Sequence, residues 1–462
     1  MLMKRNEIDF TTGEGRVLVG KIIKFAVPVI LAYLVQQLYS SADMIFISNY
    51  IGKEGAAAVG ASTSFIALSI GFFGGLTTGA GIIYARAYGA RDIEAQKKIS
   101  RVVFILSLTV GTGLSVAGFF TARPALLLLQ TPVEIIDIAA SYASLYFLSI
   151  MPMMLYGMSS GILRAAGDSR TPLIFQVISG GLNILLDWWF ISTWDNPIAG
   201  AAVASVIAQG VAAAGTHIYL KQVEKKLVAA DSEVVKSGLK IPRETGDIIK
   251  NVFVLGVPLG IQSMLMTFSN VVVQGNVNSL GINIMSAFAT ESRVEMAFWM
   301  TASSFGQTTL YALSQNLGAG RRDRVRTVIR NILKVTIPVE IAIALITYFG
   351  GRLLFGMFTR DPAVINIGIL ILRFTTPFYF VYGIMEVMSN SIRSYGKTTV
   401  AMAIYLVFIA GLRIAGMIIF NLTGTLNIYT VSVVYPISWI GATLCAYLYW
   451  RKLRGKELYK DR

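Results

Sequence analysis

Long apolar stretches alternate with short polar ones along the whole chain. A membrane-spanning helix needs about 20 predominantly apolar residues, and the hydrophobic pattern predicts twelve such spans. The expected spans cover residues 22–48, 57–85, 100–121, 136–162, 171–192, 198–220, 251–277, 284–312, 328–356, 364–391, 398–420 and 428–450. The pattern therefore predicts an all-α integral membrane protein with twelve transmembrane helices.

The second half of the chain repeats the first at a spacing of about 230 residues. Pro28 recurs as Pro258, and Gly52 recurs as Gly281. Features that stay in register over a whole half predict two pseudo-symmetric six-helix bundles, and tandem membrane repeats are typical of secondary transporters. We expect an N-lobe, a cytoplasmic linker and a C-lobe, over residues 1–221, 222–250 and 251–462.

Composition and charge agree with a membrane location. Hydrophobic residues make up 55% of the chain and charged residues 14%, whereas a soluble domain carries roughly 25% charged residues. The net charge of +15 is unevenly placed. We place the N-terminus in the cytoplasm and consider the lysines and arginines in the loops and at the span ends. Only four of them then lie on the opposite side of the membrane: Lys53, Arg123, Arg352 and Arg360. This positive-inside bias predicts a multi-pass protein of the cell inner (plasma) membrane with both termini cytoplasmic. The basic loops also suit contact with membrane lipids.

Several other classes of protein fit the sequence poorly. No basic face joins an aromatic stacking platform, so we expect no nucleic-acid partner. The chain has one cysteine, Cys445, and one histidine, His217. It contains no nucleophile–base or metal constellation, so we expect neither enzymatic activity nor an organic cofactor. We expect a monomer.

Four polar side chains are predicted to meet in the outer half of the bilayer. Asp43 lies about 21 residues into the first helix and Asp187 about 16 into the fifth, which at roughly 1.5 Å per residue places both at a similar depth. Asn183 precedes Asp187 by four residues and therefore shares its helix face. Ser205, about seven residues into the returning sixth helix, reaches the same level. The cluster suits either a shared proton or a Na⁺ ion held by Asp43, Asn183 and Asp187.

Each of these residues also has a simpler interpretation. Asp43 would cap the outer end of the first helix and face water. Asp187, followed by Trp188 and Trp189, would be an interfacial aspartate in an aromatic belt. Asn183 and Ser205 would only hydrogen-bond or pack between helices.

The second lobe does not repeat this cluster. Val273, Arg413 and Met417 stand at the positions where its acidic and amide residues would recur. We therefore expect ion coupling to be confined to the first lobe. Arg413 and Arg373 instead offer partners for Glu295 in a structural lock.

Three further residues are candidates to line a substrate cavity: Gln36, Glu295 and Glu386. Glu295 either meets a cationic substrate or takes part in that lock. Glu386 lies toward the inner end of the tenth helix, where it is either a snorkelling residue or part of a site. We expect Glu340 to be paired or to face water.

The second helix carries glycines at four-residue spacing, in the pattern Gly71-x-x-x-Gly75-x-x-x-Gly79. Such a row permits the backbones of two helices to approach closely, so it predicts helix packing. It is not a phosphate-binding loop, because no Walker lysine follows and the segment lies within the membrane.

The chain resembles the multidrug and toxic compound extrusion (MATE) transporters over nearly its whole length. The features that carry the resemblance are Pro28 and Asp43, Gly52 with Ala57-Ala58-Val59-Gly60, Gly89-Ala90-Arg91, Gly318-Ala319-Gly320, Leu163-Arg164-Ala165-Ala166-Gly167-Asp168, Asn183-x-x-x-Asp187 and Ile198-Ala199-Gly200-Ala201-Ala202. The resemblance implies two six-helix bundles forming a V-shaped cavity. It also implies an N-lobe ion site made of Asp43, Asn183, Asp187 and Ser205.

The resemblance further implies an antiporter that expels amphipathic organic cations in exchange for H⁺ or Na⁺. Many bacterial members carry acidic groups on helices 7 and 10. Here helix 7 has none, and Glu386 departs from the expected position. The same carboxylates and amide would serve either ion, so the choice between H⁺ and Na⁺ stays open. The alternative is a lipid-linked precursor flippase of the wider superfamily, which Arg373 and Arg413 would suit.

Overall fold

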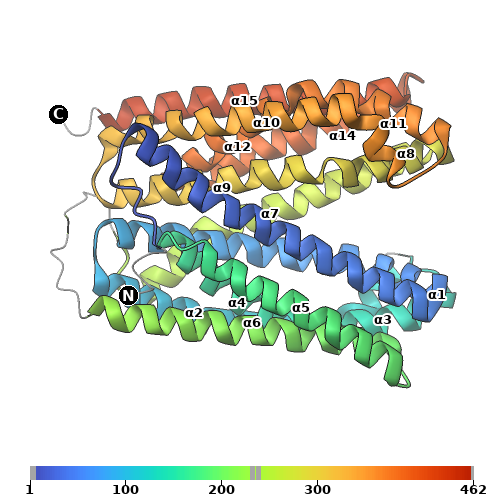
Figure 1. The fold of residues 1–462 in the computed structure, drawn as a ribbon, viewed down its shortest axis with the longest axis horizontal. Coiled ribbons are helices and arrows are strands. Elements are labelled where there is room, and N and C mark those ends of the chain that lie inside the picture. The colour runs from blue at the N-terminus through green and yellow to red at the C-terminus, as the bar shows by residue number, and fades with distance from the viewer. Residues whose placement is uncertain (1–6, 129, 229–234, 236–240, 459–462) are drawn as a thin grey trace. The chain divides into compact units, whose positions relative to one another are not determined.

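The computed structural model describes residues 7–128, 130–228, 235 and 241–458. Throughout these residues the secondary structure is helical, with no strand (Figure 1). Ten of the described helices are long and apolar enough to cross a membrane, and the pair Val133–Phe147 and Ile150–Ala165, bent by 42°, adds an eleventh span.

The first repeat contains six helical spans in the order that the sequence predicts. Its first two helices, Gly15–Tyr50 and Ala57–Gly89, share the label α1 and are separated by a kink at Gly52, whose backbone is not helical. The helices are α1 (Gly15–Gly89), α2 (Ile93–Leu128), α3 (Val133–Phe147), α4 (Ile150–Ala165), α5 (Arg170–Thr193) and α6 (Pro197–Val228).

The second repeat is divided into more segments. They are α7 (Thr245–Asn278), α8 (Ile282–Val294), α9 (Met296–Gly318), η2 (Arg322–Arg324), α10 (Val325–Gly356), α11 (Pro362–Thr375), η3 (Thr376–Phe378), α12 (Tyr379–Ser394), α13 (Thr398–Ile404), η4 (Tyr405–Gly411), α14 (Leu412–Leu422) and α15 (Ile428–Leu458). Each of the twelve predicted spans coincides with a helix or with consecutive helical segments. The predicted span 284–312 is broken at Glu295, between α8 and α9.

The repeat extends to the backbone conformation of its turns. Gly52 has φ 80° and Gly281 has φ 104°, and each lies where the first helix of its repeat gives way to the second. Gly167 and Gly396 likewise share a positive φ, of 93° and 79°. Glycine adopts this region without the steric penalty of a Cβ atom. The equivalent glycines therefore make equivalent turns, which confirms the two-lobed repeat.

The chain forms two compact units. Unit 1 comprises residues 1–9, 27–260 and 318–320, and unit 2 comprises residues 10–26, 261–317 and 321–462. The unit boundaries inside α1 and α7 fall within two residues of Pro28 and Pro258. The lobe boundaries expected at 221 and 251 stay a prediction, and much of the expected linker, over 229–234 and 236–240, lies outside the described residues.

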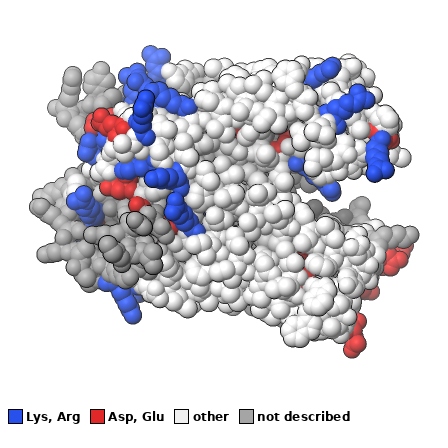
Figure 2. Space-filling view, viewed as in Figure 1, with Lys and Arg blue, Asp and Glu red and all other residues white. Residues whose placement is uncertain are grey.

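Charged side chains are distributed as a membrane protein requires. In Figure 2 lysine and arginine gather toward the helix ends, and few charged side chains lie over the middle of the helices. Large apolar side chains in the middle of helices are exposed, including Leu185 at 64% and Ile346 at 66%. Such exposure is unfavourable in water but suits contact with lipid.

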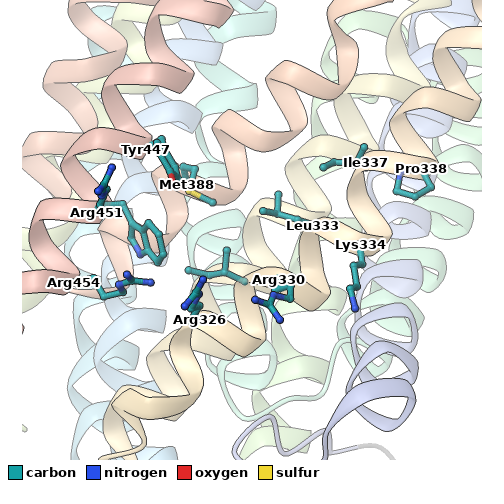
Figure 3. A pocket seen from close by; sticks show the side chains of 12 residues that line it. Arg326, Arg330, Leu333, Lys334, Ile337, Pro338, Met388, Tyr447, Arg451 and Arg454 are labelled. Carbon is teal, nitrogen blue, oxygen red and sulfur yellow. The ribbon is translucent and has the colours of Figure 1, made fainter. Parts of the chain in front are cut away.

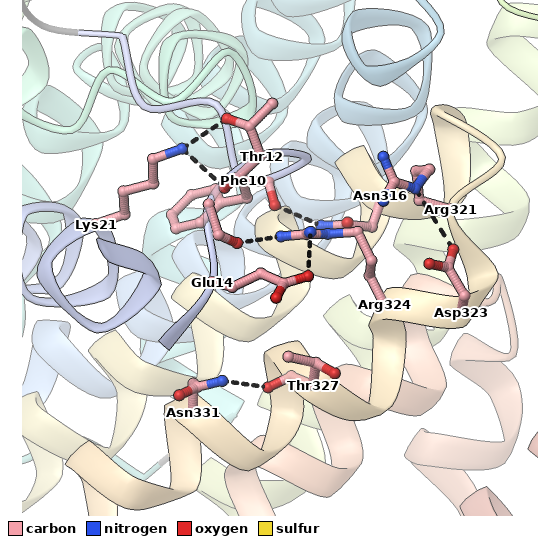
Figure 4. A network of polar contacts seen from close by, with 11 residues as sticks. Phe10, Thr12, Glu14, Lys21, Asn316, Arg321, Asp323, Arg324, Thr327 and Asn331 are labelled. Atoms are coloured by element: carbon pink, nitrogen blue, oxygen red, sulfur yellow. Dashed lines mark hydrogen bonds and ion pairs between the residues drawn. The ribbon is translucent and has the colours of Figure 1, made fainter. Parts of the chain in front are cut away.

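Within unit 2, the segment before α1 is held by the turn between α9 and α10 (Figure 4). Gln315 Oε1 accepts from the Phe10 amide at 3.0 Å, and Asn316 Nδ2 donates to the Phe10 carbonyl at 3.0 Å. Arg324 forms an ion pair with Glu14 at 3.6 Å and donates to the Gly13 carbonyl. These bonds fix where the first helix begins.

Candidate functional site

One face of α5 is polar although the helix lies in a membrane span. Its buried residues include Gln176, Ser179, Asn183 and Asp187, spaced three or four apart. This spacing places them on one side of the helix. Trp188 is 59% exposed whereas Asp187 is 0% exposed. The aromatic residue therefore faces outward, while the acid faces the interior of unit 1.

Helix α6 packs beside α5 and meets this polar face. Asn183 Nδ2 donates to Ser205 Oγ at 3.5 Å, and Ser179 Oγ donates to the Ala208 carbonyl at 2.9 Å. Four oxygen- or nitrogen-bearing groups thus join two helices. Asn183 and Ser205, two members of the predicted cluster, are therefore in contact across the two helices.

Asp43 reaches the same place from α1. Its carboxyl group lies against that of Asp187. No described group donates a hydrogen bond to either carboxyl oxygen of Asp187, to Asp43 Oδ1 or to Asn183 Oδ1, although all four oxygens are buried. The structure therefore brings together all four residues of the predicted cluster: Asp43, Asn183, Asp187 and Ser205.

The electrostatics of this carboxyl pair are unusual. Like charges repel, and the repulsion grows as the effective dielectric falls. Buried charges are normally paired or hydrogen-bonded, yet neither Asp43 nor Asp187 forms an ion pair within the described residues. A shared proton or a bound cation would remove the repulsion. The unpartnered oxygens are the kind of ligand that hard cations prefer.

A small cavity of about 10 Å³ lies beside the pair. It is lined by Tyr39, Tyr146, Ser179, Asn183, Ser205, Ala208 and Gln209. That volume is close to the minimum that holds one water molecule. Gln209 Nε2 donates to the Tyr39 hydroxyl at 3.4 Å, which ties α6 to α1.

Three groups of this site, Tyr39, Tyr146 and Gln209, were not among the residues predicted from the sequence. A signal for two of them was present, because Tyr39 precedes Asp43 by four residues and Gln209 follows Ser205 by four. Each therefore shares a helix face with a predicted residue. Tyr146 lies on α3, and only the packing of α3 against α6 brings it here.

Unit 2 contains a second pair of buried carboxyl groups. Glu291 lies against Glu295, and these residues are 8% and 5% exposed. Unlike the pair in unit 1, this one has donors: Tyr379 donates to Glu295 Oε1 at 2.8 Å and Trp299 Nε1 to Oε2 at 3.3 Å. Adjacent buried acids thus occur in both lobes, and confinement of ion coupling to the first lobe stays a prediction.

The expected structural lock between Glu295 and an arginine is absent among the described residues. Arg413 is 1% exposed and lies under the ring of Tyr435, with its Nε atom donating to Ser438 Oγ at 3.3 Å. Arg373 is exposed. The aromatic ring stabilises Arg413 through a cation–π contact.

Glu386, like Glu295, is buried and hydrogen-bonded. Tyr382 donates to its Oε1 at 3.2 Å, Tyr405 donates to the same oxygen, and Asn390 Nδ2 donates to Oε2 at 3.0 Å. Tyr405 begins the π-helical turn η4, and such turns are frequent at functional sites. At 8% exposure Glu386 is a buried side chain, so the snorkelling alternative does not describe it.

The three residues expected to line a substrate cavity lie in different units. Gln36 is exposed on α1 in unit 1, whereas Glu295 and Glu386 belong to unit 2. Their grouping around a substrate stays a prediction.

Glu340 was expected to be paired or to face water, and this is wrong. It is 0% exposed, and neither carboxyl oxygen has a hydrogen-bond partner, because its side chain packs against Gly383 of α12.

The described residues contain no group of three or more His, Cys, Asp or Glu that would hold a metal ion. The cluster of Asp43, Asn183 and Asp187 offers two carboxylates and one amide. That set matches a singly charged cation better than a divalent one, whose sites usually collect more charge.

A family model described as MatE matches residues 28–189 and, again, residues 258–419. The two matches correspond to the two repeats. They include Asp43, Asn183 and Asp187 in the first match, and Glu295 and Glu386 in the second.

Similar proteins cover nearly the full length of the chain. The probable multidrug resistance protein YpnP of Bacillus subtilis is 27% identical over 97% of this chain and 98% of its own. The multidrug export protein MepA of Staphylococcus aureus is 22% identical over 92% and 93%. The crystal structure of a substituted form of the Vibrio cholerae MATE transporter VcmN has the same fold, with a TM-score of 0.85 at 22% identity, over 95% of this chain and 97% of that one.

Proposed function

The chain belongs to the MatE family of membrane transporters, and on that premise we propose that it is a secondary active multidrug efflux antiporter. It exports amphipathic organic cations in exchange for H⁺ or Na⁺. The names of its relatives, multidrug resistance and multidrug export proteins, support multidrug efflux. The observation that carries the exchange step is the buried carboxyl pair of Asp43 and Asp187, which has no protein counter-charge.

Coupling follows from the electrostatics of that pair. When the pair is charged, it attracts a cation, and the positive charge of the organic substrate can compensate the negative charge of the pair. When a proton or a Na⁺ ion neutralises it, that attraction is lost and the contacts of α1 with α5 change. The substrate and the coupling ion therefore compete for one charge, which is the physical basis of exchange. Asn183 and Ser205 would position the pair, and with Na⁺ the Asn183 oxygen would be a further ligand.

The proposal is tested with the purified full-length protein in proteoliposomes loaded with a fluorescent organic cation such as ethidium. Na⁺ and pH gradients are applied separately. We expect Asp43→Asn and Asp187→Asn each to lower gradient-driven transport at least about tenfold, which corresponds to about 1.4 kcal/mol in the coupled step. The neutral amide can neither release a proton nor supply a full negative charge.

Asp195→Asn is the matched control, because Asp195 is exposed in the turn after α5. It makes the same chemical change outside the site and is expected to transport as the unaltered protein does. Full transport by both Asp43→Asn and Asp187→Asn, at equal amounts of reconstituted protein, would contradict the proposal. The gradient that drives transport identifies the coupling ion.

The alternative function, flipping of a lipid-linked precursor, rests on the buried guanidinium of Arg413. Its Nη2 atom has no hydrogen-bond partner, so it could receive an anionic group. The same vesicles separate the two functions when they carry a headgroup-labelled anionic polyprenyl phosphate. Transbilayer movement of that lipid without cation transport would favour the flippase.

We also propose that the protein resides in the cell inner (plasma) membrane as a monomer, with both termini in the cytoplasm. The MatE match and the apolar helices support a multi-pass membrane protein. The basic loops support the orientation.

A further inference from the structure

A cavity of about 600 Å³ lies in unit 2 between α10 and α15, with α12 behind it (Figure 3). Both outer helices pack against α12, which contributes Met388 to the floor. This volume lies within the range of about 300–1,000 Å³ that is typical of sites for small molecules and cofactors. Its lining consists of Arg326, Ile329, Arg330, Leu333, Lys334, Ile337, Pro338, Met388, Tyr447, Trp450, Arg451 and Arg454.

The lining is strongly basic. Arg326, Arg330 and Lys334 recur at four-residue spacing on α10 and therefore share one helix face. Arg451 and Arg454 come from the last turns of α15. Among the described residues, no acidic side chain lines the cavity and none of these five cations forms an ion pair.

Two donors in the cavity wall are buried without a partner. Trp450 Nε1 and Arg454 Nε have no hydrogen-bond acceptor in the structure. The guanidinium of Arg454 lies over the Trp450 ring, 5.2 Å from its centroid. A buried donor without an acceptor is destabilising, because it has lost its hydrogen bonds to water and gained none in return. An acceptor supplied by a ligand would remove that cost.

The cavity is also polarised along the helix axes. Figure 3 shows Arg326, Arg330 and Arg454 toward one end, and Ile337 and Pro338 toward the other. The basic end is formed where α10 begins and α15 ends. A bound molecule that satisfies both ends must have an anionic head and an apolar body.

We propose that this cavity binds one anionic phospholipid. The arginines would bind the phosphodiester, because a guanidinium matches phosphate oxygens with paired hydrogen bonds. Trp450, whose ring lies against the Arg454 guanidinium, would lie at the level of the glycerol backbone, as aromatic residues do at membrane interfaces. The acyl chains would pack along Leu333, Ile337 and Pro338.

Two properties of the cavity favour a phospholipid over free phosphate. The apolar part of the wall would remain unfilled by an inorganic anion. Basic clefts between transmembrane helices on the cytoplasmic side are also suited to anionic lipid headgroups. The proposed topology places the start of α10 and the end of α15 on that side. This lipid site is independent of the carboxyl pair in unit 1.

The test uses native mass spectrometry of the purified full-length protein, titrated with phosphatidylglycerol or with phosphatidylcholine of the same acyl chains. We expect phosphatidylglycerol to bind more tightly. Combined replacement Arg326→Gln, Arg330→Gln and Arg451→Gln removes three exposed cations of the cavity. It is expected to weaken phosphatidylglycerol binding about tenfold or more, since each basic residue near a membrane surface contributes substantially.

The control combination is Lys98→Gln, Lys397→Gln and Lys452→Gln. These lysines are exposed and do not line the cavity, so the change in net charge is the same. Equal loss of binding in both combinations would mean general surface attraction and would overturn the proposal. Equal affinity for the two lipids, or displacement of phosphatidylglycerol by millimolar inorganic phosphate, would also overturn it. Lys334→Gln alone, with a smaller expected loss, serves if the combined cavity variant does not fold.

Discussion

At the scale of single residues, the environment of each acid decides its chemistry more than its identity does. Asp187 and Glu295 are both buried carboxyl groups beside a second acid. Glu295 accepts hydrogen bonds from Tyr379 and Trp299. Asp187 accepts none. Since a carboxylate is stabilised by donors, the pair in unit 1 depends more strongly on an external proton or cation.

Glu7 allows a test at this scale outside the membrane spans. Burial raises the pKa of Glu7 above its ordinary value of 4.5, and the nearby Asp168 acts in the same direction, whereas the hydrogen bond from Tyr88 lowers it. A raised pKa in the folded state means that the protonated form is preferred there. The resulting stabilisation is fully present below pH 4.5 and is lost as the pH rises through the raised pKa.

We therefore expect Glu7→Gln, which imitates the protonated form, to be more stable than the unaltered protein at about pH 8 and similar to it at about pH 4. Thermal unfolding of both proteins in the same detergent measures the difference. Glu54→Gln is the control, because Glu54 is exposed. A difference between Glu7→Gln and the unaltered protein that does not change with pH would contradict the assignment.

At the scale of helices, small residues set how closely the backbones approach. A Cβ atom on Gly75 would lie 2.2 Å from the backbone nitrogen of Gly260, and one on Gly79 would lie 2.8 Å from that of Gly256. The glycine row predicted on the second helix therefore packs against α7 within unit 1. The packing interpretation is confirmed at these two positions.

Neighbouring glycines on this helix provide a matched pair of variants. Gly75→Ala is expected to destabilise the protein by about 1–3 kcal/mol, because the methyl group must displace backbone. Gly74 has nothing within 4 Å of its Cβ position. Gly74→Ala is therefore expected to be neutral or stabilising by up to about 1 kcal/mol. Thermal unfolding in detergent measures both, and equal effects at the two positions would contradict the close approach.

At the scale of the whole molecule, the two repeats share turns but differ in polar chemistry. Gly52 and Gly281 make equivalent turns, whereas the acid pairs occupy different helices: α1 with α5 in unit 1, and α8 with its C-cap in unit 2. A repeated backbone can thus carry unrelated polar sites. This is expected when packing constrains the scaffold and only a few positions determine the chemistry.

The orientation of the whole chain makes a further prediction. In a Cys445→Ser background, a cysteine at Thr425 should react with a membrane-impermeant maleimide added to intact cells, because the proposed topology places this loop outside. A cysteine at Lys397 should react only after the membrane is opened. Both positions are exposed. The reverse pattern of labelling would invert the proposed orientation.

Much of the fold and part of the site were predictable from the sequence. Hydropathy located the twelve spans, and four-residue spacing placed Asn183 with Asp187 on one face, because both signals are local. The sequence did not reveal Tyr405 as a donor to Glu386, because Tyr405 comes from a later helical segment. The sequence also led to a wrong prediction for the surroundings of Glu340, whose burial depends on contact with Gly383.

The sequence alone thus determined the helical spans, the repeat and the polar helix faces, since each follows from residues close together in the chain. Only the tertiary structure decided which faces meet. It placed Asp43 against Asp187 without a donor, brought Tyr379 to Glu295, and formed a basic cavity between α10 and α15. The physical reason is that pairing between helices depends on side-chain packing across distant segments, which hydrophobic periodicity does not specify.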